Sequence, residues 1–108
     1  MSTQEPGVIC DFSIYPLDKG ASLSSYVARS LTIIEASGLP YRFGPMSTAV
    51  EGSYTECMEL MGRCFDAVAG DCDRVAVNCR LDFRRGRVDS MSCKIASVEK
   101  RVGKPLKK

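Results

Sequence analysis

The sequence contains no histidine, and none of its six cysteines forms a Cys-x-x-Cys pair. These absences remove the usual zinc-binding spacings and the commonest general base of enzymes. No apolar run is long enough to cross a bilayer, so we expect no membrane partner. The net charge of +2 is too small to indicate nucleic acid by itself. Residues 1–7 lack the basic and apolar segments of a signal peptide, which predicts a cytoplasmic protein.

The composition that remains is typical of one globular domain. The chain has 108 residues, of which 44% are apolar and 26% charged, with no internal repeat or low-complexity segment. This length supports one hydrophobic core and is too short for two. We therefore expect a single domain over residues 1–108, with its core between about 8 and 103.

The cysteines are better interpreted as small apolar residues than as disulfide partners. Most of them occupy apolar positions of predicted strands and helices, where a free thiol packs as a small hydrophobic group. Cys57 and Cys64 fall on one predicted helix, about 10 Å apart along its axis, which is too far for a disulfide. We expect reduced, structural thiols at Cys10, Cys57, Cys64, Cys72, Cys79 and Cys93.

Alternation of apolar and polar residues predicts four strands. Residues 8–15 and 74–82 alternate over their whole length, each with one apolar side. Two shorter strands, over 39–43 and 47–51, flank the turn at Gly44-Pro45 and form a hairpin-like pair. The apolar side of the first strand consists of Val8, Cys10, Phe12 and Ile14.

Helical periodicity fills the segments between these strands. Ser22 is placed to cap a first helix that Gly38 ends, with an apolar stripe of Leu23, Val27, Leu31 and Ile34. Ser53 and Glu56 form a capping box at the start of a second helix, which ends at Gly70. A third helix near the C-terminus carries the stripe Met91, Ile95, Val98 and Val102.

The order strand, helix, strand, strand, helix, strand, helix predicts the fold class. It is the pattern of an α+β, ferredoxin-like βαββαβ sandwich with an additional C-terminal helix, in which helices cover one face of a four-stranded antiparallel sheet. The other face includes Ile9, Tyr15 and Ala76 and lacks a helix to cover it. We expect a second copy to dock there, sheet against sheet.

Several segments resemble one known family. They are Phe12-Ser13-Ile14-Tyr15-Pro16-Leu17, Tyr26-Val27-Ala28, Gly44-Pro45-Met46-x-Thr48-x-x-Glu51-Gly52, Arg84-Arg85-Gly86-Arg87 and Val98-Glu99-Lys100-Arg101-Val102-Gly103. Over about residues 8–103 the sequence is similar to the small thiamine-binding protein family, most specifically at 44–52. The resemblance implies a homotetramer built as a dimer of dimers. It also implies non-catalytic binding of thiamine or its hydroxymethylpyrimidine moiety, with no cofactor.

A thiamine site needs hydrogen-bonding groups for the aminopyrimidine, a flat surface against its ring and tolerance of positive charge. Ser13 and Asn78 lie in the polar phase of the first and last strands, which are neighbours in this fold, and an amide can donate and accept at once. The two side chains could instead bond to each other in a subunit interface. Tyr15 and Met46 could flank the ring, or pack between two sheets.

The remaining candidates come from the hairpin turn and the last strand. Ser47 and Thr48 belong to the family motif, although Thr48 shares the core-facing phase of Val50. Arg80 could hold a phosphate together with the arginine-rich turn, because arginine pairs with phosphate bidentately. We favour a plainer interpretation in which the turn is solvated and Arg80 forms an ion pair. Three carboxylates could complement the thiazolium or pair with these arginines: Asp11, Glu51 and Asp82.

Other function classes are less well supported. An acylphosphatase would need an arginine in the loop after the first strand, and residues 16–20 contain none, so we expect no enzyme. An RNA-recognition domain would carry aromatic residues on its inner strands, and 47–51 has none, so we expect no nucleic-acid partner. The main alternative is a small-molecule sensor or regulatory domain of the same fold, with another metabolite bound at a subunit interface.

Overall fold

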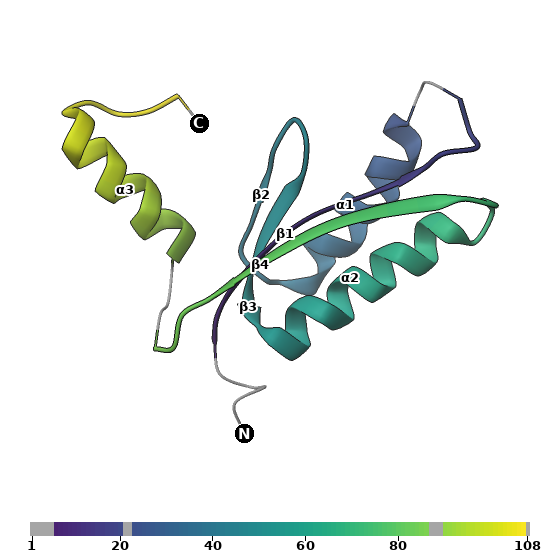
Figure 1. The fold of residues 1–108 in the computed structure, drawn as a ribbon, viewed down its shortest axis with the longest axis horizontal. Coiled ribbons are helices and arrows are strands. Elements are labelled where there is room, and N and C mark those ends of the chain that lie inside the picture. Colours follow the sequence, from purple (N-terminus) through teal and green to yellow (C-terminus); the bar gives the residue numbers. More distant parts are fainter. Residues whose placement is uncertain (1–5, 21–22, 87–89, 108) are drawn as a thin grey trace.

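The computed structural model describes residues 6–20, 23–86 and 90–107. The elements follow the predicted order: β1 (Pro6–Pro16), α1 (Ser24–Ser37), β2 (Tyr41–Phe43), β3 (Thr48–Ser53), α2 (Tyr54–Ala69), β4 (Val75–Phe83) and α3 (Ser90–Val102). The strands form one antiparallel sheet in the order β2-β3-β1-β4 (Figure 1). The predicted α+β, ferredoxin-like fold is confirmed. None of the helices in the described ranges is long and apolar enough to span a membrane.

Local sequence explains how the two long helices begin and end. Ser53 and Glu56 make the predicted capping box of α2, each side chain accepting from the other residue's backbone N–H. Ser22, the predicted cap of α1, lies outside the described residues, and Leu23 occupies the cap position without a side-chain bond. Gly38 ends α1 with a φ of 78°, a left-handed conformation that glycine adopts without a steric penalty.

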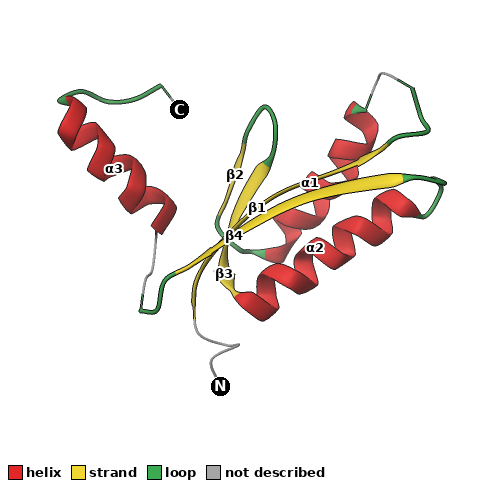
Figure 2. Cartoon of the chain, viewed as in Figure 1, coloured by secondary structure: helices red, strands yellow, loops and turns green. Residues whose placement is uncertain are grey.

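The core lies between the sheet and the pair of helices α1 and α2 (Figure 2). The predicted apolar side of β1 is buried against α2, with Val50 of β3 beside it. Helix α2 contributes a stripe at helical spacing, and α1 contributes Ile34. The buried apolar residues are Val8, Cys10, Phe12, Ile14, Ile34, Val50, Cys57, Leu60, Cys64 and Val68.

Strand β1 has two neighbours over only part of its length. It pairs with β3 as far as Phe12, which lies opposite Thr48. Its pairing with β4 continues to Pro16, which lies opposite Val75. Beyond Phe12, β1 is therefore paired with β4 only, and its other edge is open on the side of α1.

Helix α3 stands apart from the sandwich (Figure 1), but hydrogen bonds join its first turn to the sheet face opposite to α1 and α2. The backbone N–H of Met91 donates to Glu51 Oε1 over 3.2 Å, and Lys94 Nζ donates to Asp82 Oδ2 over 2.7 Å. An acidic side chain at a helix N-terminus is favoured by the helix dipole. The expectation that no helix of this chain touches this face is thus wrong near Glu51.

Strand β4 forms as predicted, but its apolar side is poorly covered. This strand is an edge of the sheet, and α1 and α2 lie mainly over β1 and β3. Val77, Leu81 and Phe83 are consequently 40–47% exposed although they share the face of the core. The sequence pattern specifies which side of β4 is apolar, but it does not show whether a helix covers that side.

Candidate ligand-binding site

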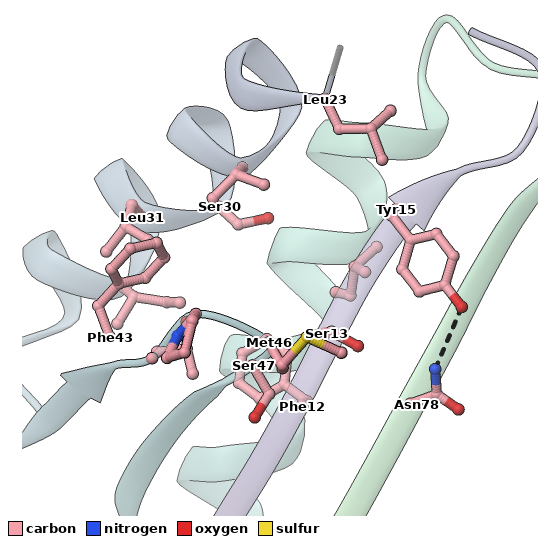
Figure 3. A pocket seen from close by; sticks show the side chains of 16 residues that line it. Phe12, Ser13, Tyr15, Leu23, Ser30, Leu31, Phe43, Met46, Ser47 and Asn78 are labelled. Atoms are coloured by element: carbon pink, nitrogen blue, oxygen red, sulfur yellow. Dashed lines mark hydrogen bonds between the residues drawn. The ribbon is translucent and has the colours of Figure 1, made fainter. Parts of the chain in front are cut away.

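A cavity of about 500 Å³ opens between α1, the second half of β1 and the turn that joins β2 to β3 (Figure 3). Strand β1 contributes residues 12–15, and Asn78 contributes from β4. The wall formed by α1 is mostly apolar, and Phe43 and residues 44–48 close the remaining side. The cavity volume lies in the usual range for small-molecule sites, which is about 300–1,000 Å³.

Strand pairing and a tight turn explain why the space exists. Because β3 pairs with β1 only as far as Thr48, no strand fills the position beside residues 13–15. The chain reverses before that point through a turn closed by the backbone N–H of Gly44, which donates to the carbonyl oxygen of Ser47 over 2.9 Å. A Cβ at position 44 would stand 2.9 Å from that same oxygen, so a larger residue would open the turn.

All of the residues predicted from the sequence as ligand-binding line this cavity except Arg80: they are Ser13, Tyr15, Met46, Ser47, Thr48 and Asn78. Ser13 and Asn78 lie directly opposite each other in the β1–β4 register, as predicted. The side chain of Asn78 does not bond to that of Ser13, however. Its Nδ2 donates to Tyr15 Oη over 3.3 Å instead (Figure 3).

Thr48 lines the cavity although its side chain points to the helix-covered side of the sheet. Thr48 pairs with Phe12 in the same regular register as Val50 with Cys10, so its side chain is on the helix-facing side of the sheet. It is only 7% exposed and lines the cavity from that side. The sequence predicts a site on the polar phase of the strands, with Thr48 as a candidate of the opposite phase. The cavity instead takes residues of both phases, because it lies beside the unpaired edge of β1, where the two faces meet.

Arg80 lies outside the cavity on the open face. Its side chain is 87% exposed, and Arg80 Nη2 lies 3.5 Å from Asp11 Oδ2. The predicted ion pair of Arg80 with an acidic residue is therefore confirmed. Asp11 also accepts a hydrogen bond of 2.6 Å from Ser47 Oγ, so a carboxylate lies directly behind one hydroxyl of the cavity rim.

Sequence reasoning missed the part of the site that α1 contributes. The sequence predicts Leu23, Val27 and Leu31 as part of an apolar helical stripe, and the structure places them in the cavity wall, where they are only partly buried. Apolar residues at helical spacing look the same whether a helix faces a core or a pocket. Ser30, a buried polar residue within this apolar stretch, was the one available signal.

The cavity is uncharged. Among the described residues, its lining contains serine, threonine, asparagine and tyrosine, but no aspartate, glutamate, lysine, arginine or cysteine. The buried thiols lie in the core, where burial raises the pKa of Cys10 and Cys64 and raises that of Cys57 to about 11. The arrangement therefore offers hydrogen bonds and apolar surface.

Residues 10–99 match the family described as thiamine-binding protein. The chain belongs to this family. A UPF0045 protein of Mycobacterium bovis is 33% identical over 99 residues, which cover 91% of this chain and 97% of the relative. The match thus extends over most of both proteins.

Solved structures show the same fold. A hypothetical protein of Methanocaldococcus jannaschii superposes with a TM-score of 0.78 at 28% identity, covering 84% of this chain and 94% of the other. A Thermotoga maritima protein, which has been proposed to act in thiamine biosynthesis or salvage, gives a TM-score of 0.75 at 22% identity, covering 86% and 99%. At that identity, the second likeness establishes the fold alone.

Proposed function

We propose that this protein binds thiamine or its hydroxymethylpyrimidine moiety in the cavity and leaves it chemically unchanged. The observation that carries the proposal is the convergence of Ser13, Met46, Ser47, Thr48 and Asn78 on one cavity of about 500 Å³. Membership of the thiamine-binding protein family supports the choice of ligand.

The chemistry of the lining suits the two rings of thiamine. Asn78 and Ser13 can donate to and accept from the edge of an aminopyrimidine. Tyr15 and Met46 supply an aromatic and a thioether surface at the side of the cavity, where Met46 is 86% exposed. Asp11, bonded to Ser47, places negative charge near the rim, where a cationic thiazolium would lie.

The same lining supports binding rather than catalysis. General acid–base chemistry needs a group that exchanges protons near neutral pH, and nucleophilic chemistry needs an activated nucleophile. Tyr15 is the one ionisable side chain of the lining, and the sequence has no histidine. We therefore propose that the protein is a binder and not an enzyme.

We further propose that the protein acts as a homo-oligomer, in which a second copy covers two apolar surfaces. One is the half-exposed side of β4, with Val77, Leu81 and Phe83. The other lies on α3, where Val98 and Val102 are 47% and 51% exposed. A two-fold pair could place the α3 of each copy on the β4 of the other, so that each copy supplies both halves of the contact. Two such pairs would form the tetramer.

The thiols favour the cytoplasm as the compartment. The cysteines whose side chains are described are all free, although Cys10 Sγ and Cys79 Sγ lie only 3.6 Å apart. An oxidising compartment would favour a bond between two thiols placed so closely. We propose that a reducing environment keeps them free.

Isothermal titration calorimetry of the full chain with thiamine and with hydroxymethylpyrimidine tests the proposed ligand. We expect saturable binding in the micromolar range and a rise in melting temperature, because a ligand that binds only the folded state stabilises it. Absence of heat and of thermal shift with both compounds would refute the proposal. Stabilisation by amino acids alone would support the sensor alternative. Native mass spectrometry of the same sample measures the stoichiometry of the assembly.

A further inference from the structure

Ser30 carries the one buried side-chain oxygen in the described residues that has no hydrogen-bond partner. The residue is 9% exposed and lies in the middle of α1. Other hydroxyls of the same helix behave differently: Thr32 Oγ1 donates to the carbonyl oxygen of Ala28 over 2.9 Å, and Ser37 Oγ donates to that of Ile34 over 2.6 Å. Buried hydroxyls are nearly always paired, so the exception at Ser30 calls for a physical reason.

The position of Ser30 supplies that reason. Ser30 belongs to the cavity wall, and in Figure 3 its hydroxyl oxygen is on the side of α1 that faces β1. The side chains of its neighbours in this wall, Val27, Leu31 and Ile34, are all apolar, and no backbone carbonyl accepts from the hydroxyl. Ser30 Oγ therefore has no partner within the described protein residues, and a ligand inside the cavity could pair with it as a donor or an acceptor.

The surroundings also restrict the chemistry of the ligand. A charged group at this depth would need a counter-charge, and the described residues of the lining supply none. An apolar group would leave the hydroxyl unpaired. The part of the ligand that reaches Ser30 must be uncharged, mostly apolar and able to form a hydrogen bond, as a nitrogen-containing aromatic ring is.

We propose that Ser30 is a ligand-binding residue, and that its hydroxyl forms a hydrogen bond with a ring nitrogen or amino group of an uncharged heteroaromatic ring inserted between α1 and β1. This inference rests on the proposed function and deepens it. It places the aminopyrimidine in the inner part of the cavity, against α1, and the charged thiazolium ring of thiamine at the rim.

Calorimetry of the Ser30→Ala variant tests the assignment. The probe is hydroxymethylpyrimidine, with toluene as an aromatic probe that cannot form the bond. We expect the variant to bind the pyrimidine about 5- to 10-fold more weakly, the usual effect of one hydrogen bond, and to bind toluene as the wild type does. Ser25→Ala, an exposed site on the same helix, is the matched control for helix propensity, and its pyrimidine affinity should stay unchanged.

Unfolding in the absence of ligand provides the second readout. Because the hydroxyl is unpaired in the free protein, Ser30→Ala should be at least as stable as Ser25→Ala. Lower stability, or failure to fold, would show that the hydroxyl serves the fold and would overturn the assignment. Wild-type affinity for the pyrimidine in Ser30→Ala would overturn it as well, while leaving the proposed function intact. If the wild type itself bound neither thiamine nor the pyrimidine, both proposals would fall together.

Discussion

Asn78 Nδ2 donates a hydrogen bond to the phenol oxygen of Tyr15 over 3.3 Å, across the neighbouring strands β4 and β1. The two residues form a diagonal pair, because Asn78 is opposite Ser13 and Tyr15 is opposite Ala76. This bond orients the amide beside the cavity and engages only one of its N–H groups. The carbonyl oxygen and the second N–H then remain available for the edge of a ligand.

Replacing Asn78 by alanine should weaken ligand binding more than it weakens the fold. Asn78 is exposed on an edge strand, so loss of its bond to Tyr15 should change the free energy of unfolding by less than about 1 kcal/mol. Loss of a ligand contact should reduce the affinity for hydroxymethylpyrimidine by about fivefold or more. Titration calorimetry and urea denaturation measure the two effects. An equal loss of oligomer and of binding would assign Asn78 to a subunit interface instead.

For the capping box of α2 we predict a variant that lowers the stability of the fold without changing ligand affinity. Ser53→Ala removes the bond of 3.1 Å from the backbone N–H of Glu56 to Ser53 Oγ, at the start of a helix that packs on the core. We expect urea denaturation to show a loss of about 1 kcal/mol. Ligand affinity should not change, because α2 does not line the cavity. Glu59→Gln, at an exposed position of the same helix, is the control and should leave both quantities unaltered.

An ion pair that joins the helices predicts a specific dependence on pH. Arg29 Nη1 and Nη2 donate to the two carboxylate oxygens of Asp71 over 2.8 and 3.0 Å, which ties α1 to the segment after α2. These hydrogen bonds hold the pKa of Asp71 at about 2, below its ordinary 3.8. A carboxylate whose pKa is lowered by folding contributes its stabilisation above the unfolded pKa and loses it as the pH falls through the folded one.

Asp71→Asn should therefore be less stable than the wild type at neutral pH. The difference in melting temperature should narrow as the pH falls from about 3.8 towards 2, where the wild-type carboxylate also becomes neutral. Thermal unfolding at a series of pH values measures this difference. Asp66→Asn, at an exposed position of α2, is the control. A difference that stayed constant down to the lowest pH would show that the ion pair is not its source.

The fold was predictable because each element carries its own local signal. The period of two in 8–15, the helical period in 54–69 and the capping box at Ser53 each specify a local structure that the tertiary contacts then agree with. The family motif at Gly44 likewise marks a turn whose backbone leaves no room for a Cβ. Local chemistry was sufficient for these elements.

The cavity could be predicted only in part, because it forms where β1 has no neighbouring strand on one side. The polar phase of β1 and β4 predicted neighbouring positions for Ser13 and Asn78, and both residues line the cavity. The pairing of β3 with β1 ends at Thr48, which leaves the edge of β1 open. That end point depends on strand register and turn geometry, which a local sequence pattern does not predict. The helical spacing of Leu31 likewise does not show how far α1 stands from the sheet, so it cannot distinguish a cavity wall from a core position.

The composition of the cavity lining makes a final prediction about phosphorylated ligands. Arg80 is 87% exposed and paired with Asp11, and no lysine or arginine among the described residues lines the cavity. A phosphate added to thiamine would then find no bidentate partner within the site. We expect thiamine monophosphate to bind no more tightly than thiamine, and Arg80→Gln to leave both affinities unchanged within about twofold. Asn78→Ala, measured in parallel by calorimetry, should weaken both ligands. A selective loss of the phosphate ester in Arg80→Gln would instead extend the site across the open face to Arg80, as the arginine-rich turn of the sequence first suggested.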